Sequence, residues 1–443
     1  MEAIMAIQFD PNVVCSCGKV HKTMVEHRLV KNGAINEIPE YVKMYGAKKA
    51  FIVADMNTYP IAGEKVKNAL EAAGLSCVTY IFPDKRVIPN EKTVGGAVMA
   101  YNKSCDIVIG VGSGVINDAC KILANVAGVP YFIVATAAYM DGYASGSSSM
   151  EVNGVKVTIP AKSPEVIVGD IDVLNGAPTF MAKAGLGDML AKYVSICEWR
   201  LSNLINGEYY CEDVAQFTRD TLKNCVDNAA GLLKRDDVAM EALFNALIDC
   251  GAAMDYAGCS RPGGGLEHYF CFVLDMRGLE FGTPTSSHGM QVLLGTLYAV
   301  KAFNEVKNIA PNKEKALEYV KNFDFEDWSR QLREFIGQSA EPMIKLEAKE
   351  KKYDPEKHAK RLEVILEKWD DILRIIDEEI PSVEEFEAIL DAIEAPKSIE
   401  AIGVEPELVT MIFKCTKDFR DKYVLPRLLW DLGVLEEVCE KVF

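Results

Sequence analysis

Short runs of β-branched residues alternate with helical patterns between about residue 50 and residue 172, and this rhythm limits the fold more than any other feature. The runs that predict strands are FIVADM, SCVTYIF, DIVIGVG, YFIVATAA and EVIVGDI, and residues 64–73 carry a helical pattern between the first two. Such alternation is typical of βαβ units, whose strands lie parallel in one sheet. The sequence therefore predicts an α/β domain with a parallel sheet over residues 1–172.

A different pattern interrupts this rhythm before the last predicted strand. The segment SSSMEVNGVKVTIP alternates apolar and polar residues around Asn153 and Gly154. An Asn-Gly dipeptide favours the type I′ turn that joins two antiparallel strands. We therefore expect a small hairpin inserted into the α/β domain.

The strand signal disappears after Asp172, and long amphipathic segments follow. We therefore predict a second, all-α domain over residues 173–443. Within it, the apolar side chains of residues 362–376 fall on one face, which predicts one continuous helix. Ser382 and Glu385 have the spacing of a capping box and predict the start of the next helix.

The overall charge of the chain excludes some partners. Its 443 residues include 65 acidic and 48 basic side chains, and the formal net charge of −17 repels nucleic acid and anionic membranes. There is no uncharged apolar stretch of about eighteen residues, and the start MEAIMAIQFDPN lacks the basic residues of a signal peptide. Thirteen cysteines scattered through apolar segments are typical of reduced thiols. We therefore expect a cytoplasmic protein that binds neither nucleic acid nor membranes.

One group of cysteines needs separate treatment. The motif CSCGKVH places Cys15, Cys17 and His21 within reach of one soft metal ion. A structural zinc site usually has a fourth ligand and two to four residues between its paired cysteines, whereas here the spacing is Cys-x-Cys and His27 is the nearby candidate for a fourth ligand. Two interpretations stay open, a metal site and a turn with incidental thiols.

The stretch DIVIGVGSGVINDACK, residues 106–121, places a glycine cluster between a predicted strand and a predicted helix. The dinucleotide pattern GxGxxG requires a third glycine where Val115 stands, and the Walker pattern lacks its Gly-Lys-Ser/Thr ending. From these residues alone, the turn either has no ligand or holds a phosphate on its backbone N–H groups.

Two histidines and one aspartate are candidate metal ligands. His268, in PGGGLEHYF, and His288, in TSSHGMQV, each follow a loop and are expected in the first turn of a helix. There the helix dipole disfavours the protonated ring, and a neutral imidazole is a metal ligand; a capping or packing role is the alternative for each. Asp188, in AKAGLGDMLAKYVS, is an acid in an apolar helix and is costly to bury unless a cation compensates it. Together they predict a three-ligand site for Zn²⁺, Fe²⁺ or a similar ion, open to a substrate oxygen.

Six motifs carry a family resemblance, namely TAAYMDGYASGSSS, IPAKSPEVIVGDIDVL, AGLGDMLAKY, SRPGGGLEH, SSHGMQVLLGT and RDKYVLPRLLWDLG. In this order and spacing the chain resembles the bacterial sn-glycerol-1-phosphate dehydrogenases. These belong to the superfamily of iron-containing alcohol dehydrogenases, glycerol dehydrogenase and dehydroquinate synthase. The resemblance implies an NAD-binding domain over residues 1–172 and a helical metal- and substrate-binding domain over residues 173–443. It also implies NAD or NADP as cofactor, one divalent zinc, iron or nickel ion, and a homo-oligomer, expected to be a dimer.

The resemblance further implies roles for individual residues. Asp141 and Asp188 are the implied catalytic residues, and Asp141 contacts the substrate near the nicotinamide. Asp188, His268 and His288 are the implied metal ligands, in agreement with the interpretation drawn from the residues themselves. The glycine turn would cradle the cofactor pyrophosphate, and the implied cofactor-binding residues are Gly112, Ser113, Gly114, Val115, Ile116, Asn117, Asp118, Thr136, Tyr139 and Ser145.

Two positions depart from the family pattern. Tyr139 stands where archaeal members carry a small hydroxyl residue. Phe272 stands four residues after His268, on the same helical face, where the family places a second histidine that contacts the substrate. Arg261, in SRPGGG, is a candidate partner for a substrate phosphate or carboxylate, with a surface salt bridge as the alternative. The expected substrate contacts are therefore Asp141, Asp188, Arg261 and Phe272.

Asp55 ends the run FIVAD and bears on the choice of cofactor. A carboxylate at the end of an early strand accepts hydrogen bonds from a ribose diol and repels the additional phosphate of NADP. Asp55 therefore predicts a preference for NAD, with an ordinary turn aspartate as the alternative.

These observations predict a metal-dependent, NAD(P)-linked dehydrogenase, with sn-glycerol 1-phosphate and dihydroxyacetone phosphate as the leading substrate pair. Phe272 leaves a dehydrogenase of another small polyol or alcohol as the alternative. A dehydroquinate-synthase-like lyase is the third candidate, although that group carries a glutamate in place of the aspartate ligand. A noncatalytic nucleotide-binding protein is the fourth, and the intact set of one aspartate and two histidines argues against it.

Overall fold

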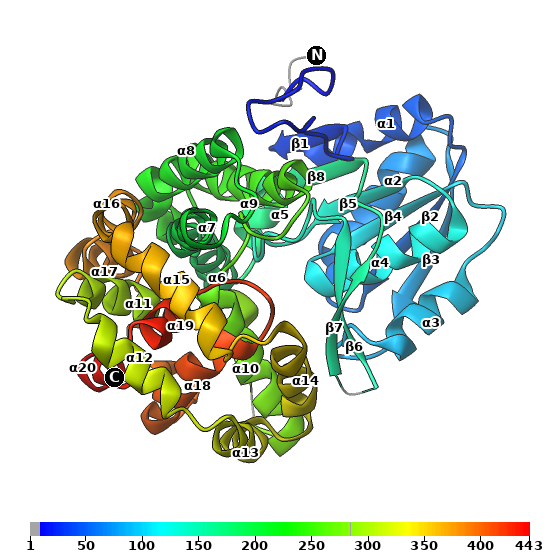
Figure 1. Cartoon of the computed structure of the whole chain (residues 1–443). Helices are drawn as coiled ribbons and strands as arrows, with labels where there is room; N and C mark the ends of the chain where they lie inside the picture. The colour runs from blue at the N-terminus through cyan, green and yellow to red at the C-terminus, as the bar shows by residue number, and fades with distance from the viewer. Residues whose placement is uncertain (1–8, 154, 284) are drawn as a thin grey trace. The chain divides into compact units, whose positions relative to one another are not determined.

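The computed structural model describes residues 9–153, 155–283 and 285–443, which form two compact units. The sheet unit comprises Met1–Met189 and Gln216–Cys259, and the helical unit comprises Leu190–Ala215 and Ser260–Phe443. Figure 1 shows the strands of the first unit and the helices of the second.

The sheet unit is built on six parallel strands in the order β1-β8-β5-β4-β2-β3 (Figure 1). Strands β4, β5 and β8 are buried along their whole length, as expected of a parallel sheet that is covered on both faces. The five predicted runs correspond to β2, β3, β4, β5 and β8, so the predicted parallel sheet is confirmed. The strands are β1 His27–Lys31, β2 Lys49–Asp55, β3 Ser76–Phe82, β4 Ile107–Gly112, β5 Tyr131–Ala135 and β8 Val166–Asp170.

Strand β1, which pairs with β8 at one edge of the sheet, was not predicted. Of its five residues, HRLVK, only Leu29 is fully buried. A strand with one buried side chain shows neither an apolar run nor a clear alternation, so sequence patterns do not reveal it.

The predicted hairpin is confirmed as β6 Ser147–Val152 and β7 Val155–Pro160, which pair antiparallel from Ser147 with Pro160 to Val152 with Val155. Asn153 has a positive φ of 52°, the left-handed conformation that this turn requires and that asparagine tolerates.

Helices connect the strands of the sheet unit and continue beyond them, so that this unit extends past residue 172. Residue 172 therefore marks where the strands end, and its use as a domain boundary stays a prediction. The helices are α1 Ile38–Met44, α2 Glu64–Ala72, α3 Glu91–Ala100, α4 Gly114–Ala127, α5 Ile171–Gly176, α6 Thr179–Leu190, α8 Glu212–Asn228 and α9 Asp237–Ala257, with short helices η1 Ala34–Glu37, η2 Tyr59–Gly63 and η3 Ala229–Lys234; α6 ends and α8 begins in segments of the helical unit.

Every regular element that the structure describes in the helical unit is a helix, as predicted. They are α7 Lys192–Asn206, α10 Leu266–Phe281, α11 His288–Val306, α12 Lys313–Lys321, α13 Phe325–Ile336, α14 Ala340–Glu350, α15 Pro355–Glu367, α16 Trp369–Glu379, α17 Val383–Ala392, α18 Val409–Cys415, α19 Leu425–Asp431 and α20 Leu435–Val442, with short helices η4 Gly337–Ser339, η5 Ile399–Ile402, η6 Pro406–Leu408 and η7 Thr416–Asp418.

The single helix predicted over residues 362–376 is wrong, because the chain bends at Lys368 and forms α15 and α16. Helix α15 packs against α12, α7 and α19, and α16 packs mainly against α7. The capping box that starts α17 is confirmed: the Ser382 hydroxyl accepts from the Glu385 N–H, and the Glu385 carboxylate accepts from the Ser382 N–H.

None of the thirteen cysteines, all of which lie in the described ranges, forms a disulfide, in agreement with the predicted reduced thiols. Among the described residues, no helix has both the length and the apolar character needed to cross a lipid bilayer.

Candidate active site

The glycine turn between β4 and α4 is shaped to hold an anion on its backbone. Strand β4 ends at Gly112, helix α4 begins at Gly114, and the Ser113 side chain makes no capping hydrogen bond to the first turn of the helix. A Cβ atom at Gly112 would lie 2.5 Å from Cγ1 of Ile116, so a side chain at this position would collide with the helix. The N–H groups of an uncapped helix and its dipole favour a phosphate. The turn therefore fits the predicted pyrophosphate site.

Two of the predicted cofactor residues bury their side chains. Asn117 accepts a hydrogen bond from the Tyr131 hydroxyl, at 2.9 Å, and donates from Nδ2 to the Gly142 carbonyl, at 3.1 Å. Ile116 is 2 % exposed and belongs to the core. Val115, which lies beside them in the first turn, is half-buried. Only the backbone groups of Ile116 and Asn117 are thus placed to serve a nucleotide.

Lys121 fastens the loop that follows β5 to helix α4. Its Nζ donates to the Gly142 carbonyl at 2.6 Å, the Ser145 hydroxyl at 3.1 Å and the Ser147 carbonyl at 3.0 Å. Burial lowers the pKa of Lys121. Burial also raises the pKa of the Asp118 carboxyl to about 6, although Lys121, 3.9 Å away, opposes this shift. The hydroxyl of Ser145, expected at the cofactor, is thus engaged within its own loop.

Two further predicted cofactor residues lie near the turn or in the same loop. Thr136 follows β5 directly, and its N–H donates to the carbonyl of Gly112 at 3.1 Å, which places it beside the glycine turn. Tyr139 lies three residues further on and is half-buried. Their contacts with a cofactor stay predictions.

Asp55 ends β2, the strand next to β4, and makes the contacts of an Asx turn. Its Oδ1 accepts from the N–H groups of Asn57 and Thr58, both at 2.8 Å. Because Val53 pairs with Gly110, Asp55 and Gly112 end neighbouring strands at the same edge of the sheet. Asp55 therefore has the structural role of a turn aspartate, and it also lies at the edge where a ribose would be read.

Asp141 and Asp188 lie together in the sheet unit. The N–H of Asp141 donates to Oδ2 of Asp188 at 2.9 Å, and the thiol of Cys250 donates to Oδ2 of Asp141 at 3.2 Å. Asp188 is fully buried in α6, as the sequence indicated. A Cβ atom at Gly185, one turn earlier, would collide with the carbonyl oxygen of Ala138, so this glycine lets α6 approach the loop that carries Asp141.

The two predicted histidines lie together in the helical unit, each in the first turn of its helix as expected. The ring centroids of His268 and His288 are 5.3 Å apart. Nδ1 of His268 lies 3.0 Å from the Glu267 carboxylate, and Nδ1 of His288 lies 3.2 Å from the Cys271 thiol. Because these contacts involve Nδ1 of both rings, Nε2 of each is the nitrogen that could bind a metal ion. A carboxylate behind the imidazole, as at His268, is a usual support of a metal-binding histidine.

Buried carboxylates support the start of α10. Glu267 accepts from the Gly265 N–H, and Glu198 of α7 accepts from the N–H groups of Leu266, at 3.0 Å, and Leu425, at 2.8 Å. Burial, together with the charge of Glu267, raises the pKa of Glu198 to about 8. The sequence prediction missed this residue, although an acid inside the buried helix segment SICEWR was a signal of the same kind as Asp188.

The expected substrate contact at Arg261 is corrected by the structure. Arg261 is 1 % exposed and forms a two-pronged ion pair with Glu208, in which Nε lies 2.8 Å from Oε1. It also donates to the Tyr423 carbonyl at 3.1 Å. A buried guanidinium that already binds a carboxylate in this way stabilises the loop before α10 and is closed to a substrate anion.

Phe272 lies beside the two histidines. Its ring centroid is 6.3 Å from that of His288 and 5.4 Å from that of Phe419, in stacked arrangements. The guanidinium of Arg420 lies 5.6 Å from the Phe272 ring centroid and 5.5 Å from that of Phe419. The Arg420 guanidinium thus lies against the same aromatic ring, Phe272, that stacks on His288. The sequence analysis did not single out Arg420, although it opens the motif RDKYVLPRLLWDLG.

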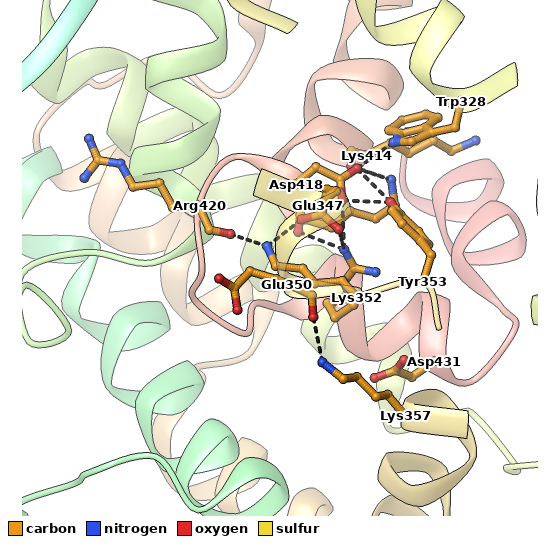
Figure 2. A network of polar contacts seen from close by, with 12 residues as sticks. Trp328, Glu347, Glu350, Lys352, Tyr353, Lys357, Lys414, Asp418, Arg420 and Asp431 are labelled. Atoms are coloured by element: carbon orange, nitrogen blue, oxygen red, sulfur yellow. Dashed lines mark hydrogen bonds and ion pairs between the residues drawn. The ribbon is translucent and has the colours of Figure 1, made fainter. Parts of the chain in front are cut away.

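A buried polar network holds the segment that carries Phe419 and Arg420. Asp418 accepts from Trp328 at 2.6 Å, Tyr353 at 2.7 Å, and Arg427 and Lys417 at 2.8 Å. Lys352, which pairs with Glu347 at 2.6 Å, donates to the Arg420 carbonyl at 2.5 Å. Figure 2 shows that the Arg420 side chain extends away from this network, so the network fixes its backbone and leaves the guanidinium outside.

The chain is similar in sequence to several named dehydrogenases. The sequence profile of the iron-containing alcohol dehydrogenase family matches residues 29–178. A glycerol-1-phosphate dehydrogenase (NAD(P)+) from Halalkalibacterium halodurans is 32 % identical over 66 % of this chain and 76 % of the relative. A protein of the same name from Bacillus licheniformis is 29 % identical over 69 % of this chain and 82 % of the relative.

Solved structures show the same fold. The crystal structure of glycerol dehydrogenase from Schizosaccharomyces pombe superimposes with a TM-score of 0.62 at 16 % identity, over 96 % of this chain and 91 % of the other. The family resemblance read from the six motifs is confirmed by these comparisons: the chain belongs to the glycerol-1-phosphate dehydrogenase family of the iron-containing alcohol dehydrogenases.

Proposed function

We propose that this chain is an NAD(P)-dependent, metal-dependent dehydrogenase that interconverts sn-glycerol 1-phosphate and dihydroxyacetone phosphate by hydride transfer. The observation that carries the proposal is the pair of imidazoles, His268 and His288, each supported at Nδ1 by a buried neighbour. The names of the relatives favour the phosphorylated substrate over an unphosphorylated polyol.

Asp188, His268 and His288 together are the ligand set proposed for one divalent ion. Two imidazoles and one carboxylate suit zinc, iron or nickel and leave a position for substrate. When bound, such an ion supplies a Lewis acid for the substrate carbonyl, and the nicotinamide supplies the hydride. The donor set therefore fits the metal that the family name implies.

The residues around these ligands position them. The Asp141 N–H holds one oxygen of Asp188, which orients the carboxylate. The Glu267 carboxylate accepts from Nδ1–H of His268, which fixes the tautomer and makes Nε2 a stronger metal ligand. The catalytic role proposed for Asp141 is a contact with the substrate near the nicotinamide.

The proposed cofactor site uses the glycine turn. N–H groups of Gly112, Ser113, Gly114 and the first turn of α4 would bind the pyrophosphate. Thr136, Tyr139 and Ser145 follow β5 and belong to the same proposed surface, and Asp118 lies on α4. Asp55 would read the ribose, which favours NAD over NADP.

The proposed partner of the substrate phosphate is Arg420 rather than Arg261. Arg420 lies against Phe272, the position at which the family pattern has a histidine. We infer that Phe272 provides an apolar wall next to His288, and that the charge for the phosphate comes from the guanidinium behind it.

The proposal is tested with the metal-reconstituted protein and a substrate panel followed by NADH absorbance. The panel contains sn-glycerol 1-phosphate, its sn-3 enantiomer, glycerol, dihydroxyacetone phosphate and dihydroxyacetone. We expect oxidation of sn-glycerol 1-phosphate and reduction of dihydroxyacetone phosphate. Faster reduction of dihydroxyacetone than of its phosphate would show that the chain is a polyol dehydrogenase instead. Turnover of none of these compounds would contradict the proposed reaction.

Two further expectations belong to this proposal. The acidic net charge and thirteen thiols without a disulfide support a cytoplasmic enzyme. The family resemblance supports a homodimer, which sedimentation or light scattering of the purified protein will test.

A further inference from the structure

The motif CSCGKVH forms a closed loop in the sheet unit. Val14 and Val20 make an isolated antiparallel bridge, and the Cys15 N–H donates to the Lys19 carbonyl at 2.9 Å. Gly18 has a φ of +84°, and its N–H donates to the Cys15 carbonyl at 2.9 Å. The left-handed glycine lets the chain reverse immediately after Cys17.

The reversal brings thiol and imidazole donors together. The Cys17 N–H lies 3.5 Å from Sγ of Cys15, and Sγ of Cys17 lies 3.5 Å from Nε2 of His21. An N–H group directed at a cysteine sulfur stabilises negative charge on it, and the thiolate is the form of cysteine that binds metals.

His21 is held as a metal-binding histidine is held. Its Nδ1 lies 2.7 Å from the Tyr256 carbonyl, and a carbonyl only accepts, so Nδ1 carries the proton and Nε2 keeps its lone pair toward Cys17. The ring is 1 % exposed and packs edge-on against Phe9 at 4.8 Å between centroids. A backbone acceptor behind the imidazole and an apolar surround are the outer contacts typical of a metal site.

We propose that Cys15, Cys17 and His21 bind one zinc ion within the sheet unit, as a site additional to the one proposed at Asp188, His268 and His288. Their ligand atoms lie within 4.8 Å of one another. Two sulfurs and one imidazole nitrogen favour zinc over ions that prefer oxygen ligands. His27, the candidate for a further ligand in the sequence, lies in β1 with its ring against Tyr41, at 5.1 Å between centroids, and is not part of this set.

A bound ion would hold the loop of Cys15 and Cys17 against His21, whose ring is itself fixed on the Tyr256 carbonyl. Binding replaces the thiol protons by the metal, so the site releases protons as it fills and loses zinc in acid. The free energy of binding then adds to the stability of the fold.

The first test uses the unaltered full-length protein, which avoids the folding of variants. Protein purified with zinc should contain about two metal ions per chain. After exchange with cobalt, the proposed site gives an intense thiolate-to-cobalt charge-transfer band, which the Asp188, His268 and His288 set has no sulfur to produce. One ion per chain together with the absence of this band overturns the proposal.

The second test assigns the ligands. The variants Cys15→Ser, Cys17→Ser and His21→Asn should each lose the cobalt band and about one zinc per chain, and the matched control Cys225→Ser, a buried thiol of the same unit, should keep both. His288→Ala should keep the band and lose the other ion, so failure of this site and failure of the proposed active site give different results. A Cys17→Ser protein that keeps the band overturns the ligand assignment.

Discussion

Replacing Arg420 by alanine tests the proposed phosphate contact directly. We expect Arg420→Ala to lower kcat/KM for dihydroxyacetone phosphate and to leave kcat/KM for dihydroxyacetone almost unchanged. The reason is the position of the guanidinium, 5.6 Å from the Phe272 ring, which itself stacks at 6.3 Å on His288. An arginine at this distance from His288 can hold the phosphate while the carbonyl end of the substrate faces His288.

The size of the effect follows from the kind of contact that is lost. A hydrogen bond to a charged group contributes about 1.5–3 kcal/mol, which corresponds to roughly ten- to hundredfold in kcat/KM. Arg420 is half-buried, so solvent screening places the expected loss toward the lower end of this range. The fold should be little affected, because Lys352 binds the Arg420 backbone carbonyl, which alanine retains, and because Phe272 and Phe419 still stack.

The assay compares both substrates with NADH at saturating cofactor, before and after the substitution. Arg374→Ala is the matched control, because Arg374 is an exposed arginine of the same unit that pairs with Asp371 and Glu378. Arg420→Lys keeps the charge without the two-pronged geometry and should give an intermediate loss. An equal loss with both substrates, or no loss with the phosphate, refutes the assignment of Arg420.

Four further predictions concern single residues. His288→Ala should remove the active-site ion and abolish NADH-dependent turnover, measured by elemental analysis and activity on one preparation; full retention of both contradicts the ligand assignment. Asp55→Ala should lower the ratio of kcat/KM for NADH to that for NADPH, and an unchanged ratio means that Asp55 only shapes its turn. Phe272→His should improve or preserve turnover of dihydroxyacetone phosphate, and a large loss shows that the apolar wall is required. Burial raises the pKa of the Asp118 carboxyl to about 6, so the folded protein binds a proton there more tightly than the unfolded chain does, and the stability that this proton contributes is lost as pH rises from about 4 to about 6. Asp118→Asn should reduce this change in the free energy of urea unfolding by roughly 2–3 kcal/mol, and the control Asp84→Asn, at an exposed carboxylate, should not.

The parts of the fold that could be read from the sequence are those in which burial imposes a pattern. Strands β4, β5 and β8 are covered on both faces and therefore appear as apolar runs, whereas β1 buries only Leu29 and gave no signal. The bend at Lys368 was not predictable in the same way, because the apolar stripe continues through it. Both α15 and α16 pack against α7, and α15 also contacts α12 and α19, so the packing of this segment depends on helices distant in sequence.

The same distinction between local and tertiary determinants applies to the residues of the candidate site. The histidines were predicted because each follows a glycine- or serine-rich loop and begins a helix, a local signal that the structure bears out. Arg261 was expected at the substrate on equally local grounds, but its partner Glu208 lies 53 residues earlier, and burial of the pair is a property of the folded unit. Local sequence identifies a charged side chain, whereas its tertiary partner decides whether that charge is available.

Arg261 and Arg420 show how tertiary contacts assign different roles to two arginines of one unit. The buried Arg261 guanidinium is paired with a carboxylate and holds the loop before α10 in place. In Arg420 the backbone is the anchored part, through Lys352 and the network around Asp418, while the side chain extends away from that network (Figure 2). Asp418 is thus expected to act on substrate choice through Arg420. Its replacement by asparagine would leave buried cations without their carboxylate and destabilise the segment that presents the guanidinium.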